Sequence, residues 1–225
     1  MAPNTGNKQV VSKQRVMDHG EVYTHPREVN AMLDLVKQET ERIDSRFLEP
    51  ACGTGNFLTE ILKRKLGVVR TRYRKNQADY ERYAVVAVSS IYGIELLEDN
   101  VQACRQRLYD IFDEEYSQLY KARAQESCRR SIHYILDKNI IWGDALTLLT
   151  VGPEPQPIVF TEWSLVNSSM LKRREFTYQE LLSNESMKEL PLFSDLGEEV
   201  LIPTPIKEYP PVHYLRIGDV EYDLV

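Results

Sequence analysis

The stretch Phe47-Leu48-Glu49-Pro50-Ala51-Cys52-Gly53-Thr54-Gly55-Asn56-Phe57-Leu58 decides the fold. A short strand leads into a tight turn with two glycines, and the next segment carries Phe57, Leu58, Ile61 and Leu62 on one face of a helix. Glycines in such a turn tolerate positive φ and let the backbone approach a ligand closely. Because open α/β sheets bind ligands at the carboxyl ends of their strands, the turn indicates a nucleotide-like site, with a purely structural turn as the alternative.

Two phosphate-binding motifs are excluded at this turn. No Gly-Lys-Ser/Thr follows it, so it is not a Walker loop, and it lacks the third glycine of the dinucleotide fingerprint.

Strands and helices are expected to alternate on both sides of the turn. Helices are predicted after Pro26, over 77–90 and over 98–120, and strands are predicted over 46–48, 91–95, 139–142 and 157–160. This alternation predicts an α/β fold with a Rossmann-like doubly wound parallel sheet, in which 157–160 is the fourth strand.

The chain is expected to divide into three parts. Residues 1–18 lack apolar periodicity and are predicted to be a flexible lead-in, and 19–165 form the main domain. Five prolines interrupt the chain beyond residue 190, so 166–225 are predicted to be an irregular, Pro-rich, acidic extension or a small strand-rich lobe. One helix is expected there, around Tyr178 to Leu182.

The charges are unevenly distributed along the 225 residues. The 28 basic and 34 acidic side chains give a net charge of −6, but residues 1–150 carry +1 and residues 151–225 carry −7. Seven of the 13 residues in 63–75 are basic and none is acidic, so this segment is predicted to be an insertion that follows phosphates or a solvated flexible loop. Composition therefore restricts where nucleic acid contact is possible and does not exclude it.

Several classes of protein are excluded by composition. The three cysteines and four histidines are too scattered for a disulfide framework or a metal site, so no metal is expected. No stretch reaches the ~18 apolar residues of a membrane helix. We expect a cytoplasmic protein that does not contact the membrane.

Two further acids follow predicted strands. Glu95 ends Ile91-Tyr92-Gly93-Ile94-Glu95, and Asp144 follows the next strand in Gly143-Asp144-Ala145-Leu146. An acid at the end of the second strand accepts hydrogen bonds from ribose hydroxyls in nucleotide-binding α/β folds. An acid beside a main-chain amide can bind an adenine amino group. Each acid alone is more simply a solvated loop residue, but with the glycine turn they form an ordered set.

This set resembles class I S-adenosylmethionine-dependent methyltransferases, and among them the N6-adenine DNA methyltransferases of restriction–modification systems. Residues 49–58 are similar to that family's cofactor loop, and 20–26 resemble its N-terminal cofactor motif, with His25 inserted between Thr24 and Pro26. The resemblance covers about residues 20 to 165. It implies S-adenosylmethionine as the cofactor, with Glu49, Gly53 and Gly55 around its methionine part, Glu95 at the ribose and Asp144 at the adenine.

The resemblance also implies which residues bind the cofactor. These residues are Tyr23, Thr24, Glu49, Ala51, Gly53, Gly55, Asn56, Phe57, Glu95, Leu96, Asp144 and Ala145.

The resemblance fails at the catalytic motif. The family's tetrapeptide, Asn/Asp/Ser-Pro-Pro-aromatic, binds the target amine and stacks on the flipped base after the fourth strand. Here Thr161-Glu162-Trp163-Ser164 begins 17 residues after Asp144 and contains neither proline. A divergent catalytic site would use Glu162, Trp163 and Asn167. The structural alternatives are a surface acid for Glu162 and a buried aromatic for Trp163.

Two hypotheses follow. The protein is either a methyltransferase with a divergent or impaired catalytic motif, or a catalytically inactive scaffold or regulatory subunit that binds S-adenosylmethionine. We find no module that reads base edges, and the charge of −7 after residue 150 would repel phosphate. DNA is therefore expected to be contacted through a partner specificity subunit, and the acidic tail is a candidate docking surface for a protein partner.

Overall fold

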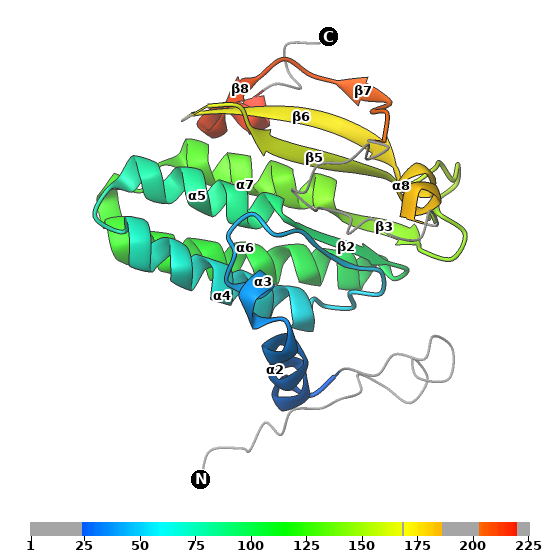
Figure 1. Cartoon of the computed structure of the whole chain (residues 1–225), viewed down its shortest axis with the longest axis horizontal. Helices are drawn as coiled ribbons and strands as arrows, with labels where there is room; N and C mark the ends of the chain where they lie inside the picture. The colour runs from blue at the N-terminus through cyan, green and yellow to red at the C-terminus, as the bar shows by residue number, and fades with distance from the viewer. Residues whose placement is uncertain (1–23, 168, 186–202, 220–225) are drawn as a thin grey trace.

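A computed structural model describes residues 24–167, 169–185 and 203–219 (Figure 1). In these ranges the strands form one sheet in the order β1-β2-β3-β4 and a second in the order β5-β6-β7, with β8 paired to β6. The strands are β1 (Phe47–Glu49), β2 (Ile91–Glu95), β3 (Ile140–Asp144), β4 (Leu149–Thr150), β5 (Val159–Leu165), β6 (Met170–Thr177), β7 (Lys207–Glu208) and β8 (Val212–His213). The helices are α2 (Pro26–Leu35), α3 (Lys37–Thr40), α4 (Asn56–Tyr73), α5 (Gln77–Ser89), α6 (Glu98–Tyr120), α7 (Glu126–Asn139) and α8 (Tyr178–Glu185), with short 3₁₀ helices η1 (Lys121–Arg123) and η2 (Tyr214–Asp219).

The first sheet confirms the expected mixed α/β character with parallel strands. Phe47 of β1 is in register with Ile91 of β2, and Gly93 of β2 is in register with Ile140 of β3, both in parallel pairs. The strand β4 is antiparallel to β3, and its Leu149 is bridged in turn to Pro157.

The prediction that 157–160 form a fourth parallel strand was wrong. The segment after Pro157 enters β5, which pairs with β6 as an antiparallel hairpin. The physical reason is packing: Ile158 and Phe160 lie in one apolar cluster with Tyr92 and Ile94, alternate residues of β2. The segment is bridged antiparallel to β4 at Pro157, where the Ile158 N–H donates to the Leu148 carbonyl at 2.9 Å, and from Val159 on it pairs with β6 instead.

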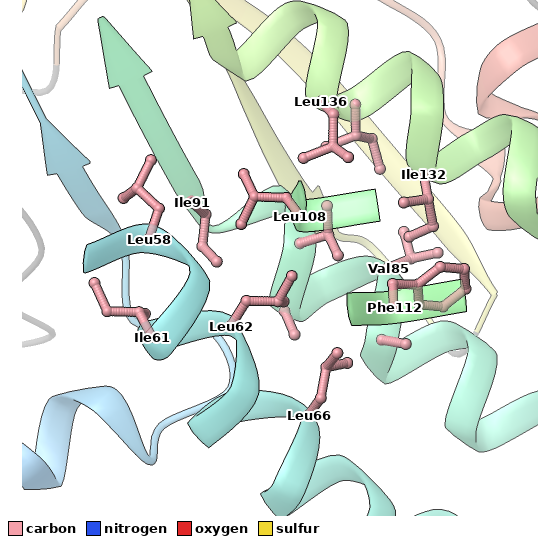
Figure 2. Close-up of a cluster of buried hydrophobic side chains, with 14 of the residues drawn as sticks. Leu58, Ile61, Leu62, Leu66, Val85, Ile91, Leu108, Phe112, Ile132 and Leu136 are labelled. Carbon is pink, nitrogen blue, oxygen red and sulfur yellow. The ribbon is translucent and has the colours of Figure 1, made fainter. Parts of the chain in front are cut away.

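The main core lies between the first sheet and its helices (Figure 2). The helices predicted over 77–90 and 98–120 are present as α5 and α6. Prediction missed α7, although its buried Cys128, Ile132 and Ile135 have helical spacing. Buried side chains from the helices and β2 meet in this core, and they include Leu58, Ile61, Leu62, Leu66, Val85, Ile91, Leu108, Phe112, Ile132 and Leu136.

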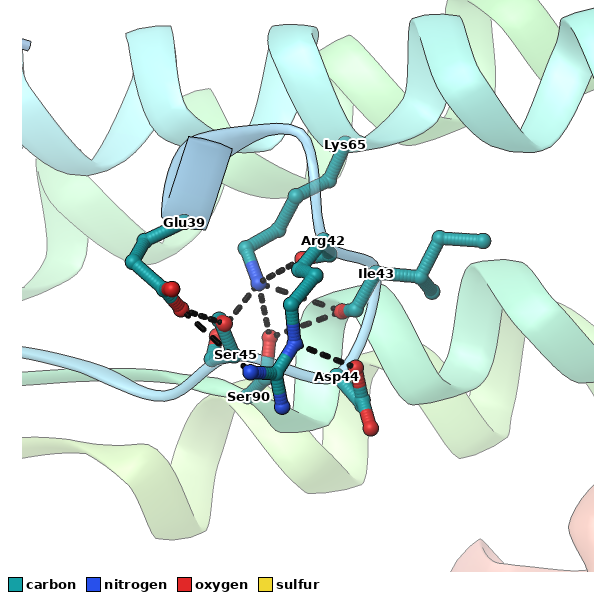
Figure 3. A network of polar contacts seen from close by, with 7 residues as sticks. All are labelled: Glu39, Arg42, Ile43, Asp44, Ser45, Lys65 and Ser90. Atoms are coloured by element: carbon teal, nitrogen blue, oxygen red, sulfur yellow. Dashed lines mark hydrogen bonds and ion pairs between the residues drawn. The ribbon is translucent and has the colours of Figure 1, made fainter. Parts of the chain in front are cut away.

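The basic segment 63–75 is neither an insertion nor a flexible loop, because most of it belongs to α4. Lys65 is fully buried, and its Nζ donates to the carbonyl oxygens of Arg42, Ile43 and Ser45 and to the Ser90 hydroxyl (Figure 3). Burial lowers the pKa of Lys65 to about 7. The hydrogen bonds of Lys65 thus connect α4 to the loop that precedes β1.

Other cations of the same segment are also in ion pairs. Arg64 contacts Asp34 at 2.9 Å, and Arg70 contacts Glu115 at 3.3 Å. Because α4 has 18 residues and starts at the glycine turn, its basic end lies ~27 Å from that turn. Any phosphate contact by this end is therefore remote from the turn.

The described part of 166–225 is strand-rich and joined to the main body. Tyr214 and Ile217 of η2 are buried in the main core, and α8 matches the helix expected around Tyr178 to Leu182. The expected boundary at 165/166 falls within the β5–β6 hairpin. The lead-in predicted over 1–18 lies outside the described residues. No helix in the described ranges is long and apolar enough to span a bilayer.

Candidate functional site

The glycine turn joins β1 to α4 and adopts a backbone that suits its two glycines. Gly53 has φ +53° and Gly55 has φ +85°, both in the left-handed region. At Gly55 space is also limiting, because a Cβ there would lie 2.6 Å from the Cys104 Sγ. The turn is fixed to β2 by a hydrogen bond of 3.0 Å from the Cys52 N–H to the Ile94 carbonyl.

Glu95 connects the end of β2 to the glycine turn. Its Oε2 accepts the Gly53 N–H at 2.8 Å, and its Oε1 accepts the Leu97 N–H at 3.0 Å. The residue is 9% exposed. Its Oε1 also accepts the Asn100 side-chain N–H at 3.4 Å. Since each carboxylate oxygen accepts two hydrogen bonds, the remaining acceptor capacity of Glu95 lies on Oε2.

The other two acids lie at the same end of the sheet. Glu49 is the last residue of β1 and Asp144 the last of β3, and parallel pairing places the carboxyl ends of β1, β2 and β3 together. Burial raises the pKa of Glu49, and the Ala51 N–H partly opposes this shift. The Asp144 Oδ1 accepts the Leu146 N–H at 2.9 Å, which orders the turn after β3.

The N-terminal segment reaches this site. The Asn56 side chain donates to the Thr24 carbonyl at 3.3 Å, so Thr24 lies at the start of α4. The inserted His25 caps α2, because its Nδ1 accepts the Arg27 N–H at 3.2 Å. Tyr23 lies outside the described residues.

The remaining expected cofactor residues lie in or directly after these strand ends and turns. Ala51 is exposed in the glycine turn, and Phe57 packs partly buried against the main core. Leu96 is 47% exposed after β2, and Ala145 is half-buried after β3. The structure therefore brings the described members of the predicted set to one end of the sheet.

Arg107 of α6 holds the glycine turn, a role that no local sequence motif indicates. Its Nη1 donates to the Thr54 carbonyl at 2.5 Å, to the Thr54 hydroxyl at 2.9 Å and to the Asn56 Oδ1 at 3.0 Å. Arg107 follows Cys104 by three residues, so both lie on the α6 face that meets the turn. The spacing of Cys104 and Arg107 is the one sequence feature that places them on the same helix face. It indicates contact with the glycine turn only when the packing of α6 is known.

The structure does not bring the three candidate catalytic residues to the glycine turn. Glu162 forms ion pairs with Arg46, the residue before β1, and with Arg174 of β6. Trp163 is 6% exposed, and its indole N–H donates to the Asn139 side chain at 3.2 Å. The Asn167 side chain accepts the Met170 N–H at 3.1 Å in the hairpin turn. Each residue thus has a structural role, and their expected catalytic role gains no support.

The basic triplet of β6 is paired with acids. Lys172 contacts Glu208 at 2.7 Å, Arg173 contacts Glu175 at 2.5 Å, and Arg174 contacts Glu162 at 2.6 Å. Within the described ranges, no group of three or more acidic, histidine or cysteine side chains is placed to hold a metal ion.

The family model described as "MmeI, DNA-methyltransferase domain" matches residues 24–149. Searches of curated proteins and of solved structures found no match. The matched region runs from the segment before α2 to β4, so it contains the glycine turn and all three strand-end acids, and it ends before β5. It spans more than half of the chain. The chain therefore belongs to the MmeI DNA-methyltransferase domain family of restriction–modification methyltransferases.

Proposed function

We propose that this chain binds S-adenosylmethionine at the glycine turn and is the cofactor-binding part of an N6-adenine DNA methyltransferase. One observation carries the proposal. Glu49, Glu95 and Asp144 end three adjacent parallel strands, and Glu95 is hydrogen-bonded to the glycine turn through the Gly53 N–H. Three acids around one turn match a ligand that has several hydrogen-bond donors.

The donor set of the proposed cofactor suits these acids. S-adenosylmethionine offers ribose hydroxyls, an adenine amino group and a methionine ammonium, and each is a donor for a carboxylate. We assign the hydroxyls to Glu95, the adenine amino group to Asp144 and the ammonium to Glu49. The raised pKa of Glu49 reflects its burial, and a cation beside it would favour the ionised carboxylate.

The start of α4 suits the remaining carboxylate of the cofactor. In the described chain, Gly55 is the N-cap and provides no side-chain cap for the first-turn N–H groups. Such N–H groups and the helix dipole favour an anion at this position. Arg107 stabilises the same turn from α6 by its hydrogen bonds to Thr54 and Asn56.

The sulfonium methyl that bound S-adenosylmethionine supplies needs an acceptor, and we assign adenine N6 in DNA by the resemblance of the motifs. An exocyclic adenine amine is a poor nucleophile, so hydrogen-bond acceptors must lie beside it. Glu162 is used in ion pairs, and Trp163 is buried. We therefore propose that the chain binds the cofactor alone but needs groups from outside these 225 residues for efficient methyl transfer to DNA.

Calorimetry with S-adenosylmethionine tests cofactor binding by the full chain. We expect Asp144→Ala to weaken binding about tenfold or more, the usual effect of losing a hydrogen bond to a charged group. Glu154→Ala is the matched control, because Glu154 is exposed in the loop after β4, and its affinity should equal that of the unmodified chain. A folded chain that does not bind the cofactor, or equal losses in both variants, would contradict the proposal.

The second candidate function is a regulatory subunit or scaffold that binds the cofactor and takes no part in methyl transfer. The structural roles of Glu162 and Trp163 favour it, because neither side chain is available to a substrate amine. Methyl incorporation into unmethylated DNA separates the two functions. Incorporation that depends on Asp144, measured with the partner subunits present, supports the methyltransferase, and incorporation unaffected by Asp144→Ala supports the scaffold.

A further inference from the structure

Arg107 of α6 connects three segments of the proposed cofactor site. Its Nη1 donates to the Thr54 carbonyl at 2.5 Å, inside the glycine turn, and to the Asn56 Oδ1 at 3.0 Å, at the first residue of α4. The Asn56 Nδ2 in turn donates to the Thr24 carbonyl at 3.3 Å, in the segment before α2. The helix α6, the glycine turn and the segment at Thr24 are therefore linked through one guanidinium group and one amide.

These contacts hold the Asn56 amide in one orientation. A side-chain amide has one acceptor oxygen and one donor nitrogen, and a guanidinium group can only donate. Arg107 therefore takes the Asn56 oxygen, and the Asn56 nitrogen faces the Thr24 carbonyl. Without the guanidinium group the amide would be free to rotate, and the Thr54 carbonyl and hydroxyl would lose their donor.

The two halves of the glycine turn are held by different elements. The first half is tied to β2, because the Gly53 N–H donates to the Glu95 carboxylate at 2.8 Å. The second half is tied to α6, because Arg107 contacts Thr54 and Asn56. Under the proposed function, Glu95 binds the ribose, and the start of α4 receives the carboxylate of the methionine part. Arg107 therefore holds the half of the turn that lies next to the methionine part.

The charge of Arg107 has no counter-charge in the part of the chain that the structure describes. Arg105, two residues earlier on α6, pairs with Asp137 at 3.3 Å, whereas no described acid lies within ion-pair distance of Arg107. Arg107 is half-buried and contacts the start of α4, where the helix dipole also presents positive charge. Two positive charges at one place favour a ligand with an anionic group there, and S-adenosylmethionine has a carboxylate.

We propose that Arg107 is a positioning residue that makes the site select ligands with an amino-acid carboxylate. The inference rests on the proposed function and assigns the residue that sets the affinity for the methionine part of the cofactor. Arg107 acts through Thr54 and Asn56, which keep the second half of the turn and the start of α4 in the geometry that receives the carboxylate. The adenosine part does not depend on it.

Two ligands that differ only in the amino-acid part separate this role from a general loss of stability. S-adenosylhomocysteine and 5′-methylthioadenosine share the adenosine and the thioether sulfur, and only the first has the ammonium and the carboxylate. Calorimetry measures the affinity of the full chain for each ligand. Because both ligands bind the same folded chains, a variant that is only less stable lowers both affinities alike, and their ratio stays constant.

Arg107→Met should lower the affinity for S-adenosylhomocysteine by about tenfold or more and change the affinity for 5′-methylthioadenosine by less than about twofold. The matched control is Arg105→Met, because Arg105 also donates from α6 to backbone carbonyls, those of Asp137 and Ile140. This control should leave the ratio of the two affinities unchanged. Equal losses for both ligands in Arg107→Met, or no loss for S-adenosylhomocysteine, would overturn the inference.

A double variant tests the route through Asn56. Asn56→Ala should also lower the affinity for S-adenosylhomocysteine, and adding it to Arg107→Met should cost less than about a further twofold, because both changes break the same contact. Losses that multiply would contradict this route.

The unmodified chain separates the inference from the proposed function. If it binds neither ligand, the proposed function is refuted and the inference with it. If it binds both ligands and their ratio is the same in Arg107→Met, the inference alone is overturned.

Discussion

At the scale of single residues, the glycine turn depends on two positions with different constraints. Gly53 has positive φ, and its N–H donates a hydrogen bond to the Glu95 carboxylate. Gly55 has positive φ and also lies against Cys104 of α6. A side chain at Gly55 is therefore excluded by backbone strain and by lack of space, which the sequence alone could indicate only as a preference for glycine.

We expect Gly55→Ala to destabilise the protein by about 2 kcal/mol or more, because strain at positive φ adds to overpacking. The added Cβ would lie 2.6 Å from the Cys104 Sγ. Gly67→Ala is the matched control, since Gly67 lies in α4 and the added Cβ meets nothing within 4 Å apart from its chain neighbours and the backbone of its own helix. It should stabilise by about 0.5–1 kcal/mol. Urea unfolding measures both, and equal stabilities of the two variants would show that Gly55 is not constrained.

At the scale of elements, α4 links the glycine turn to the loop before β1 through Lys65. Its Nζ donates to three carbonyl oxygens and one hydroxyl and to no carboxylate, and the charges of Asp44 and Glu39 nearby offset only part of the effect of burial on its pKa. Counted by charge alone, the basic run 63–75 favours contact with phosphate. Charge counts do not distinguish a buried lysine from an exposed one, and this distinction needs the position of α4 against the sheet.

Lys65→Met should destabilise the protein at pH 7 by about 1–3 kcal/mol, because three buried carbonyls lose their donor. The difference in unfolding free energy between the unmodified chain and the variant should then grow as pH rises. Between the folded pKa of about 7 and the unfolded value of 10.5, the unfolded chain binds the extra proton, so higher pH favours the folded state. The slope is at most about 1.4 kcal/mol per pH unit.

Urea unfolding of both proteins at pH 7, 8 and 9 measures this slope. The control is Lys63→Met, whose exposed side chain should give a difference independent of pH over the same range. If the difference in unfolding free energy for Lys65→Met does not change with pH, the three carbonyl groups keep Lys65 in its ammonium form over the whole range.

Some elements could be predicted from local sequence patterns, and others could not. The turn at Gly53 and Gly55, the acid Glu95 and helices α5 and α6 follow from local patterns of glycine, charge and apolar spacing. The helix α7 has such a pattern and was missed. The pairing of β5 could not be predicted from its own sequence. The alternation of Ile158 and Phe160 suits a strand at the edge of the sheet as well as one that packs on its face. Arg107 could not be assigned because its contacts depend on the packing of α6 against the turn.

At the scale of the whole molecule, the second sheet and the parallel sheet are joined by polar contacts as well as by packing. Glu162 of β5 forms ion pairs with Arg46 before β1 and with Arg174 of β6, and these arginine side chains are 26% and 28% exposed. The position of Glu162 in the sequence suits a catalytic acid. Its surroundings indicate that it fixes the hairpin to the sheet, and this role predicts a different response to mutation.

Glu162→Gln should lower the unfolding free energy by about 2 kcal/mol, because it removes the carboxylate charge that pairs with two partly buried guanidinium groups. Its affinity for S-adenosylmethionine should stay within about twofold of the unmodified chain, since Glu162 does not contact the glycine turn. Glu208→Gln is the control, because it removes the exposed ion pair with Lys172 on the same sheet and should cost less than about 0.5 kcal/mol. If the Glu162→Gln chain keeps its stability but the assembled enzyme transfers no methyl group, Glu162 has a catalytic role and not the structural role described above.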